Sequence, residues 1–199
     1  MIEQFKKDFR GYGLNKPTRS NLSFSYNQTN KRPIIYEHLK KDFLERCGYC
    51  GWSCSFYGAE RFNIDHFNPS LKGTDKDSYS NYVFACPICN KTKNDRAIPT
   101  DPIHPNYSKY FVRNEFGRIM VNTKLSKEEI INAKCIHENL GFNKEIYAFD
   151  YYIMSLDLVY NHLIISSETI KDHEMKDTIH LINRTLSKII SRKTMYKIL

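Results

Sequence analysis

Hydrophobic residues recur every three or four positions through two long stretches in the last third of the chain, residues 143–165 and 168–190. A repeat of this kind is typical of an amphipathic helix. We therefore expect two helices whose apolar stripes form core or bind a partner and carry no chemistry. The stripes consist of Ile146, Phe149, Ile153, Leu156, Tyr160 and Leu163 in the first stretch and of Ile179, Ile182, Leu186 and Ile189 in the second.

A shorter helix is expected at residues 127–140. Ser126 and Glu129 have the spacing of a capping box, in which each side chain accepts a hydrogen bond from the backbone N–H of the other residue at the start of a helix. Gly141 is suited to end this helix, because glycine readily takes the left-handed conformation of a C-terminal cap. The spacing of apolar residues in 34–46 also fits a helical period.

The remaining patterns indicate short strands and turns. Residues 47–98 carry cysteines between short apolar runs, and two further runs surround Phe116-Gly117, which indicates a β-hairpin. We therefore divide the chain into a basic, partly ordered arm at residues 1–33, a cysteine-bearing core at 34–98, and a hairpin followed by helices at 99–199.

Charge points toward a polyanionic partner. The formal net charge of the 199 residues is +8, and the excess of Lys and Arg lies near the two ends, in residues 1–32 and 187–199. Basic residues that neutralise phosphates release counterions from nucleic acid, although basic ends can also serve only to keep a protein soluble. No run of about 18 apolar residues suggests a membrane span. The first thirty residues lack the apolar core of a signal peptide, so we expect a cytoplasmic protein with reduced thiols.

Four of the six cysteines form two C-x2-C pairs, Cys47 with Cys50 and Cys86 with Cys89. A tight turn between the members of each pair lets both sulfurs face one ion, and four thiolates make a closed tetrahedral zinc site. We therefore predict structural Zn²⁺ at these residues. Cys54 and Cys135 are expected to be ordinary buried or half-buried thiols, with Cys54 a remote candidate for a substitute ligand.

An acid and a histidine, Asp65 and His66, lie between the two cysteine pairs, so the zinc site would hold both flanks of the segment that carries them. Asn81 follows them, and Asn90 comes directly after the second pair. The order C-x2-C, Asp-His, Asn, C-x2-C-Asn-x2-Lys over about residues 43–96 resembles HNH nucleases of the ββα-metal, or treble-clef, type. The resemblance implies an α+β fold with a small zinc-pinned ββα core in region 34–98, with the hairpin and helices around it.

The resemblance also implies a division of roles in phosphodiester hydrolysis. Asp65 and Asn90 would hold a catalytic Mg²⁺ or Mn²⁺, His66 would activate water as the general base, and Asn81 would brace the loop that carries the histidine. The residue types suit these roles, because imidazole accepts protons near neutral pH and hard cations prefer oxygen ligands.

Two lysines after the second cysteine pair are candidates for nucleic-acid binding. We expect Lys91 and Lys93 to begin a helix, where lysines and the helix N-terminus would favour phosphate. A solvated helix face is the alternative. Asp75 and Asp77, in the polar loop 70–80, are expected to be solvated and to hold no metal.

A narrower resemblance concerns residues beyond the second cysteine pair. Asp101-Pro102, the hairpin around Phe116-Gly117 and the segment AKCIHENLGFNKEIYAFD look like HNH proteins of bacterial anti-phage systems of the Septu and retron type, which work beside an ATPase. Phe149-Asp150 stand where that family pattern often carries an arginine. Three hypotheses therefore stay open: a DNA endonuclease, a non-catalytic zinc module that binds nucleic acid or protein, and a nuclease directed at RNA such as tRNA.

Overall fold

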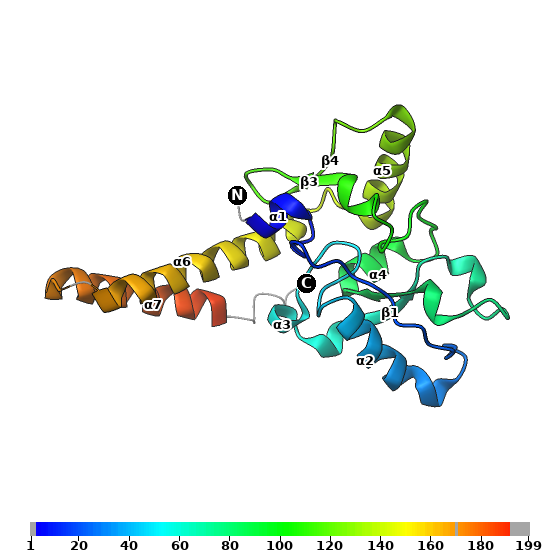
Figure 1. The fold of residues 1–199 in the computed structure, drawn as a ribbon, viewed down its shortest axis with the longest axis horizontal. Helices are drawn as coiled ribbons and strands as arrows, with labels where there is room; N and C mark the ends of the chain where they lie inside the picture. The colour runs from blue at the N-terminus through cyan, green and yellow to red at the C-terminus, as the bar shows by residue number, and fades with distance from the viewer. Residues whose placement is uncertain (1–2, 170, 192–199) are drawn as a thin grey trace. The chain divides into compact units, whose positions relative to one another are not determined.

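The chain forms two units, the first ending at Ala148 and the second starting at Phe149, and the computed structural model describes residues 3–169 and 171–191 (Figure 1). The strands are β1 (Asn63–His66), β2 (Tyr82–Ala85), β3 (Phe111–Arg113) and β4 (Ile119–Val121). The helices are α1 (Glu3–Lys7), α2 (Arg32–Asp42), α3 (Cys54–Tyr57), α4 (Pro87–Lys93), α5 (Lys127–Leu140), α6 (Phe149–Thr169) and α7 (His173–Ser191).

A β-hairpin and a helix form the centre of the first unit. β1 pairs antiparallel with β2, with Asp65 opposite Val83 and His66 opposite Tyr82, and α4 follows directly. All four residues of β2 are buried, and α2 and α4 both pack against β1. This ββα arrangement confirms the predicted α+β class.

The first cysteine pair sits on a tight turn that is bonded to β2. The backbone N–H of Gly51 donates to the carbonyl of Cys47, and the N–H of Gly48 donates to the carbonyl of Phe84, both at 2.8 Å. Gly51 has a φ of +83°, and a Cβ added there would lie 2.0 Å from the Arg10 carbonyl oxygen. Only glycine therefore fits at this position.

The N-terminal segment packs against the same turn, whereas we expected a partly ordered arm. Phe5, Phe9 and Tyr12 are buried. The fully buried guanidinium of Arg10 donates to the carbonyls of Gly48 and Pro102, each at 2.8 Å. The expectation rested on the polar character of the segment and on Gly11, Gly13, Pro17 and Pro33, which break any long pattern. The aromatic side chains of the segment nevertheless pack in the core of the first unit.

The hairpin and capped helix predicted after the cysteine-bearing region are confirmed. β3 pairs antiparallel with β4. The N–H of Glu129 donates to Ser126 Oγ at 3.3 Å and the N–H of Ser126 donates to Glu129 Oε2 at 3.0 Å, while Gly141 has the left-handed φ of +63°. The helix therefore starts and ends as its caps indicate.

The helix expected at 34–46 starts and ends earlier, because α2 covers Arg32–Asp42. Leu44 and Glu45 take positive φ values of 51° and 58°, which end the helix and turn the chain toward Cys47. Apolar Phe43 kept the helical period in the sequence, although it is already the C-terminal cap.

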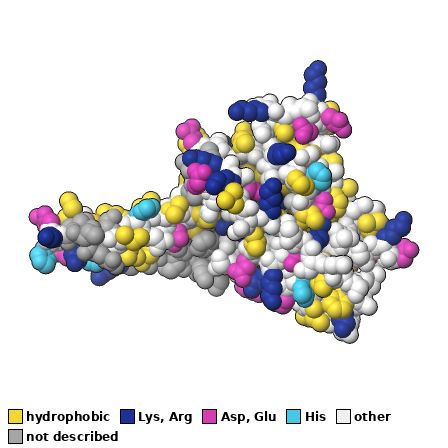
Figure 2. All heavy atoms as spheres, in the orientation of Figure 1, with side chains coloured by type: hydrophobic (Ala, Val, Ile, Leu, Met, Phe, Trp, Pro, Cys, Tyr) yellow, Lys and Arg dark blue, Asp and Glu magenta, His cyan; other side chains and the backbone are white. Residues whose placement is uncertain are grey.

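The second unit consists of α6 and α7, which pack along each other. Their starts fall later than predicted; residues Glu145–Ala148 form a 3-10 turn instead, and Tyr147 of that turn is buried. Hydrophobic side chains including Val159, Ile165 and Leu181 are exposed on these helices (Figure 2). The predicted stripe residues Leu186 and Ile189 lie outside the side chains that the structure describes. Within residues 3–169 and 171–191, no helix is long and apolar enough to cross a membrane.

Candidate active site

The four cysteines of the two C-x2-C pairs meet in one cluster. Their sulfur atoms all lie within 4.8 Å of one another, and the Sγ atoms of Cys50 and Cys86 are 3.8 Å apart. Tetrahedral zinc with Zn–S bonds of about 2.3 Å requires sulfurs roughly 3.8 Å apart. All four side chains are fully buried, and burial raises the pKa of the Cys50 and Cys89 thiols well above the usual value. The donor set therefore fits a structural zinc ion, which would hold these thiols as thiolates.

The two remaining cysteines lie apart from this cluster. Cys54 is buried in α3, as expected, and supplies no ligand to the cluster. Cys135 is exposed on α5, which corrects the expectation of a buried or half-buried thiol. It falls on the outward side of that helix, whereas its neighbour Ile136 faces the core.

His66, at the end of β1, is held by a carboxylate. Both oxygens of Asp77 lie within 3.3 Å of His66 Nε2, and both side chains are buried. Burial lowers the pKa of His66, against the opposing effect of Asp77. The imidazole is therefore neutral near pH 7, the state in which it can accept a proton.

The position of Asp77 corrects the expectation that it is solvated. Its side chain is fully buried, and Oδ2 also accepts a hydrogen bond from the N–H of Gly73 at 3.1 Å. The loop between β1 and β2 folds back over β1, so Asp77 reaches a histidine eleven residues earlier. Asp75, two positions away, is exposed as expected.

Asp65 points away from His66 and into a second set of contacts. Its Oδ2 accepts a hydrogen bond from the Tyr49 hydroxyl at 2.6 Å and lies 3.2 Å from Lys93 Nζ. Burial raises the pKa of Asp65, while Lys93 and the Tyr49 hydroxyl lower it. Tyr49 and Lys93 thus fix the orientation of a buried carboxylate, whose oxygens are potential ligands for a cation.

Lys93 is placed differently from the expectation of a nucleic-acid contact. Its side chain is fully buried, and Nζ also donates to the His66 carbonyl at 2.8 Å. The helix α4 begins at Pro87, inside the second cysteine pair, so Lys91 and Lys93 lie in its last turn and not at its N-terminus. Lys91 is exposed, and it remains the candidate of the two for contact with nucleic acid.

Replacing Lys93 with methionine should destabilise the first unit by about 3–5 kcal/mol, because the Asp65 carboxylate would stay buried without its cation. Lys91→Met is the matched control, since it removes an exposed lysine from the same helix. The free energy of unfolding of both variants can be measured in urea by the fluorescence of Trp52, the single tryptophan. Equal stability of the two variants would contradict the structural role of Lys93.

Asn81 braces the segment after His66 through its amide. The N–H of Asn68 donates to Asn81 Oδ1 at 2.7 Å, and Asn81 Nδ2 donates to the Asn68 carbonyl at 2.9 Å. The N–H of Phe67 also donates to the Asn81 carbonyl, at 2.7 Å. The first two bonds join the side-chain amide to the backbone, and the third joins two backbone groups.

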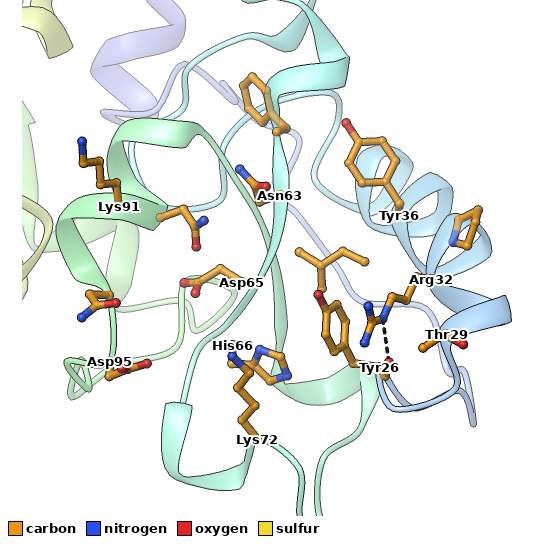
Figure 3. Close-up of a pocket in the computed structure, with 15 residues that line it drawn as sticks. Tyr26, Thr29, Arg32, Tyr36, Asn63, Asp65, His66, Lys72, Lys91 and Asp95 are labelled. Carbon is orange, nitrogen blue, oxygen red and sulfur yellow. Dashed lines mark hydrogen bonds between the residues drawn. The ribbon is translucent and has the colours of Figure 1, made fainter. Parts of the chain in front are cut away.

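The first unit has a cleft of about 840 Å³ beside β1 and α4 (Figure 3). Asp65, His66 and Asn90 line it together, so residues from β1 and α4 face one space. Lys91 lines the same cleft. Asn81 and Lys93 do not line it, but they hold the backbone of the adjacent segment through hydrogen bonds to Asn68 and His66. The arrangement places a neutral imidazole, a carboxylate and an amide oxygen around a space large enough for a phosphodiester.

Other residues of the cleft were not predicted. Tyr26 and Arg32 come from the N-terminal segment, and Lys72 comes from the loop between β1 and β2. No periodic pattern marks them. A tyrosine and an arginine six residues apart in a basic segment offered the single available signal, and it is a weak one.

Residues 47–96 match the family model of the HNH endonuclease. The matched range contains all four clustered cysteines as well as Asp65, His66, Asn81 and Asn90. The match and the cysteine cluster together support a nuclease domain with a nucleic-acid substrate. No curated protein and no solved structure is found to match the chain.

Proposed function

We propose that the protein is a metal-dependent HNH endonuclease that hydrolyses phosphodiester bonds of DNA. The observation that carries the proposal is the buried His66–Asp77 pair, whose histidine lines the same cleft as Asp65 and Asn90 within the range that matches the family model. A zinc module that only binds would need the four cysteines but would have no use for a neutral histidine oriented by a buried carboxylate.

His66 is proposed to be the general base. A carboxylate can only accept a hydrogen bond, so we assign the imidazole proton to Nε2, which faces Asp77. Nδ1 then carries the lone pair and can take a proton from the attacking water. Asp77 keeps the ring in this tautomer and stabilises the imidazolium that forms, as the aspartate of a catalytic triad does.

Asp65 and Asn90 are proposed to hold the catalytic cation, Mg²⁺ or Mn²⁺. Their carboxylate and amide oxygens are ligands that hard cations prefer, and both line the cleft beside His66. Such a cation, when bound, would neutralise charge that develops on the phosphate. Asn81 is proposed to support catalysis by holding the segment after His66 in place.

Incubation of the purified protein with plasmid DNA tests this function. We expect cleavage with added Mg²⁺ or Mn²⁺, none without a divalent cation, and little with His66→Ala. A structured RNA in a parallel reaction tests the alternative of an RNA-directed nuclease. Equal cleavage by the wild type and His66→Ala would refute the mechanism, and binding without cleavage under every metal condition would favour the non-catalytic module.

We further infer that the nuclease acts in the cytoplasm in bacterial anti-phage defence, beside an ATPase partner. The support is the resemblance of Asp101-Pro102, the hairpin around Phe116-Gly117 and the segment that follows it to the HNH proteins of Septu and retron systems. Phage plaque counts on bacteria that carry the chain with its neighbouring genes test the inference, and His66→Ala should restore plaque formation.

A further inference from the structure

One wall of the cleft is built by residues that precede the range matching the family model. Tyr26, Arg32 and Tyr36 line the cleft from this segment, and they face the space that Asp65 and His66 border from β1 (Figure 3). The wall therefore lies outside the matched range, and its chemistry can be considered separately.

Arg32 is fixed in position by Tyr26. Its Nε donates to the Tyr26 carbonyl at 3.0 Å, and the guanidinium carbon lies 3.9 Å from the centre of the Tyr26 ring. In the part of the chain that the structure describes, its two terminal nitrogens have neither a hydrogen-bond acceptor nor a carboxylate partner. A guanidinium held by stacking, with two donor groups left over, is suited to a phosphate.

Tyr26 is itself anchored beside the general base. Its N–H donates to the Tyr82 hydroxyl at 2.7 Å, and its ring meets the His66 ring edge-on with 5.3 Å between centres. Tyr26 thus separates Arg32 from His66 by about one ring, as Figure 3 shows. A phosphate on Arg32 would lie close to, but not at, the phosphate attacked beside His66.

A second cation lies near His66 from the loop between β1 and β2. Lys72 is exposed, borders the cleft, and has no carboxylate partner among the described residues. Lys72 and His66 line the same cleft. Burial lowers the pKa of His66, and the charge of Lys72 lowers it to a smaller extent. Arg32 and Lys72 therefore offer two unneutralised cations beside one catalytic group.

The aromatic rings of this wall already contact neighbouring side chains. Arg32 covers one face of Tyr26, and the Tyr26 and His66 rings are T-shaped to each other. The Tyr36 hydroxyl donates to the Ala59 carbonyl, and its ring is T-shaped to that of Phe84. Among the described residues, the terminal nitrogens of Arg32 are unpaired donors of this wall, and a guanidinium that contacts phosphate carries no sequence information.

We propose that Arg32, held on Tyr26, and Lys72 form a phosphate-binding subsite for the DNA backbone next to the bond that is cut. The proposal rests on the proposed function for the identity of the ligand. It assigns the N-terminal segment a part in binding DNA through phosphates, independent of sequence.

Fluorescence anisotropy with a fluorescein-labelled 20-base-pair duplex tests the subsite, in buffer without added divalent cations and at several salt concentrations between about 0.05 and 0.2 M. The logarithm of the association constant falls with the logarithm of the salt concentration, and loss of one phosphate contact should make this slope less steep by about 0.9. The change corresponds to roughly eightfold weaker binding at 0.1 M salt. We expect this change for Arg32→Ala and for Lys72→Ala, and the same factor for a second duplex of unrelated sequence.

Arg118→Ala is the matched control, because it removes an exposed arginine outside the cleft that pairs with Glu145. Arg32→Lys should recover the salt slope, and unchanged Trp52 fluorescence would show that the variants are folded. Wild-type affinity in both alanine variants, or a loss confined to one of the two duplex sequences, would overturn the proposal. The anisotropy assay measures binding and not cleavage. If the protein never cleaves DNA, the proposed function is refuted, but the effect of the Arg32 and Lys72 variants on DNA binding can still be measured.

Discussion

Serine in place of Cys89 is expected to leave the first unit unfolded and without bound zinc. The four thiols are fully buried where the two cysteine pairs converge on the ββα core. Structural zinc contributes about 10–16 kcal/mol in small zinc-dependent domains at neutral pH, which equals or exceeds the typical stability of a whole domain. If the loss of one ligand abolishes zinc binding, the lost binding free energy therefore exceeds the free energy of unfolding of the first unit.

Trp52 reports this transition directly. It is the single tryptophan of the chain, is buried two residues after Cys50, and stacks on Tyr57 with 3.9 Å between ring centres. We expect the Trp52 emission of Cys89→Ser to be shifted to the red. The same shift is expected for the wild type after its zinc is removed. A metal assay should find one zinc ion per wild-type chain.

Cys135→Ser is the control for the zinc experiment, since it makes the same replacement of sulfur by oxygen at an exposed cysteine outside the cluster. It should keep both the zinc and the blue-shifted emission of the wild type. A Cys89→Ser variant that retained one zinc ion and a native emission spectrum would show that the cluster does not hold the fold together.

The cysteine cluster could be predicted because its signal is local: two residues between the cysteines of a pair fix a tight turn. The ββα core was instead implied by the resemblance to HNH nucleases, which rests on the order of Asp65, His66 and Asn90 around the two pairs. The capped helix at 127–140 was equally readable, because a capping box acts within four residues.

Asp77 and Lys93 were misplaced because their surroundings depend on chain folding over longer distances. An aspartate in a polar loop reads as solvated until the loop closes over His66. The helical period held one unused signal: Asn90 and Lys93 are three residues apart in α4, so Lys93 shares a helix face with the residue implied to hold the cation.

Loss of His66 and loss of the Asp77 carboxylate should slow DNA cleavage through the same step. A positioned general base contributes about 10²–10⁴-fold to rate, so we expect a loss of that order for His66→Ala. Asp77→Asn keeps the shape of the side chain but replaces a pure acceptor by a group that can donate to Nε2, which favours the wrong tautomer. We expect it to lower kcat by at least about 10-fold with little change in KM.

The double variant His66→Ala/Asp77→Asn distinguishes positioning from a merely structural role. If Asp77 acts through His66, the double variant cleaves no more slowly than His66→Ala, because nothing remains for Asp77 to orient. Asp75→Asn, an exposed aspartate in the same loop, should cleave at the wild-type rate and serves as the control. Additive losses in the double variant would mean that Asp77 acts elsewhere, for instance by holding the loop through the N–H of Gly73. Single-turnover cleavage of a labelled duplex measures the four variants and the wild type, and unchanged Trp52 emission separates slow chemistry from unfolding.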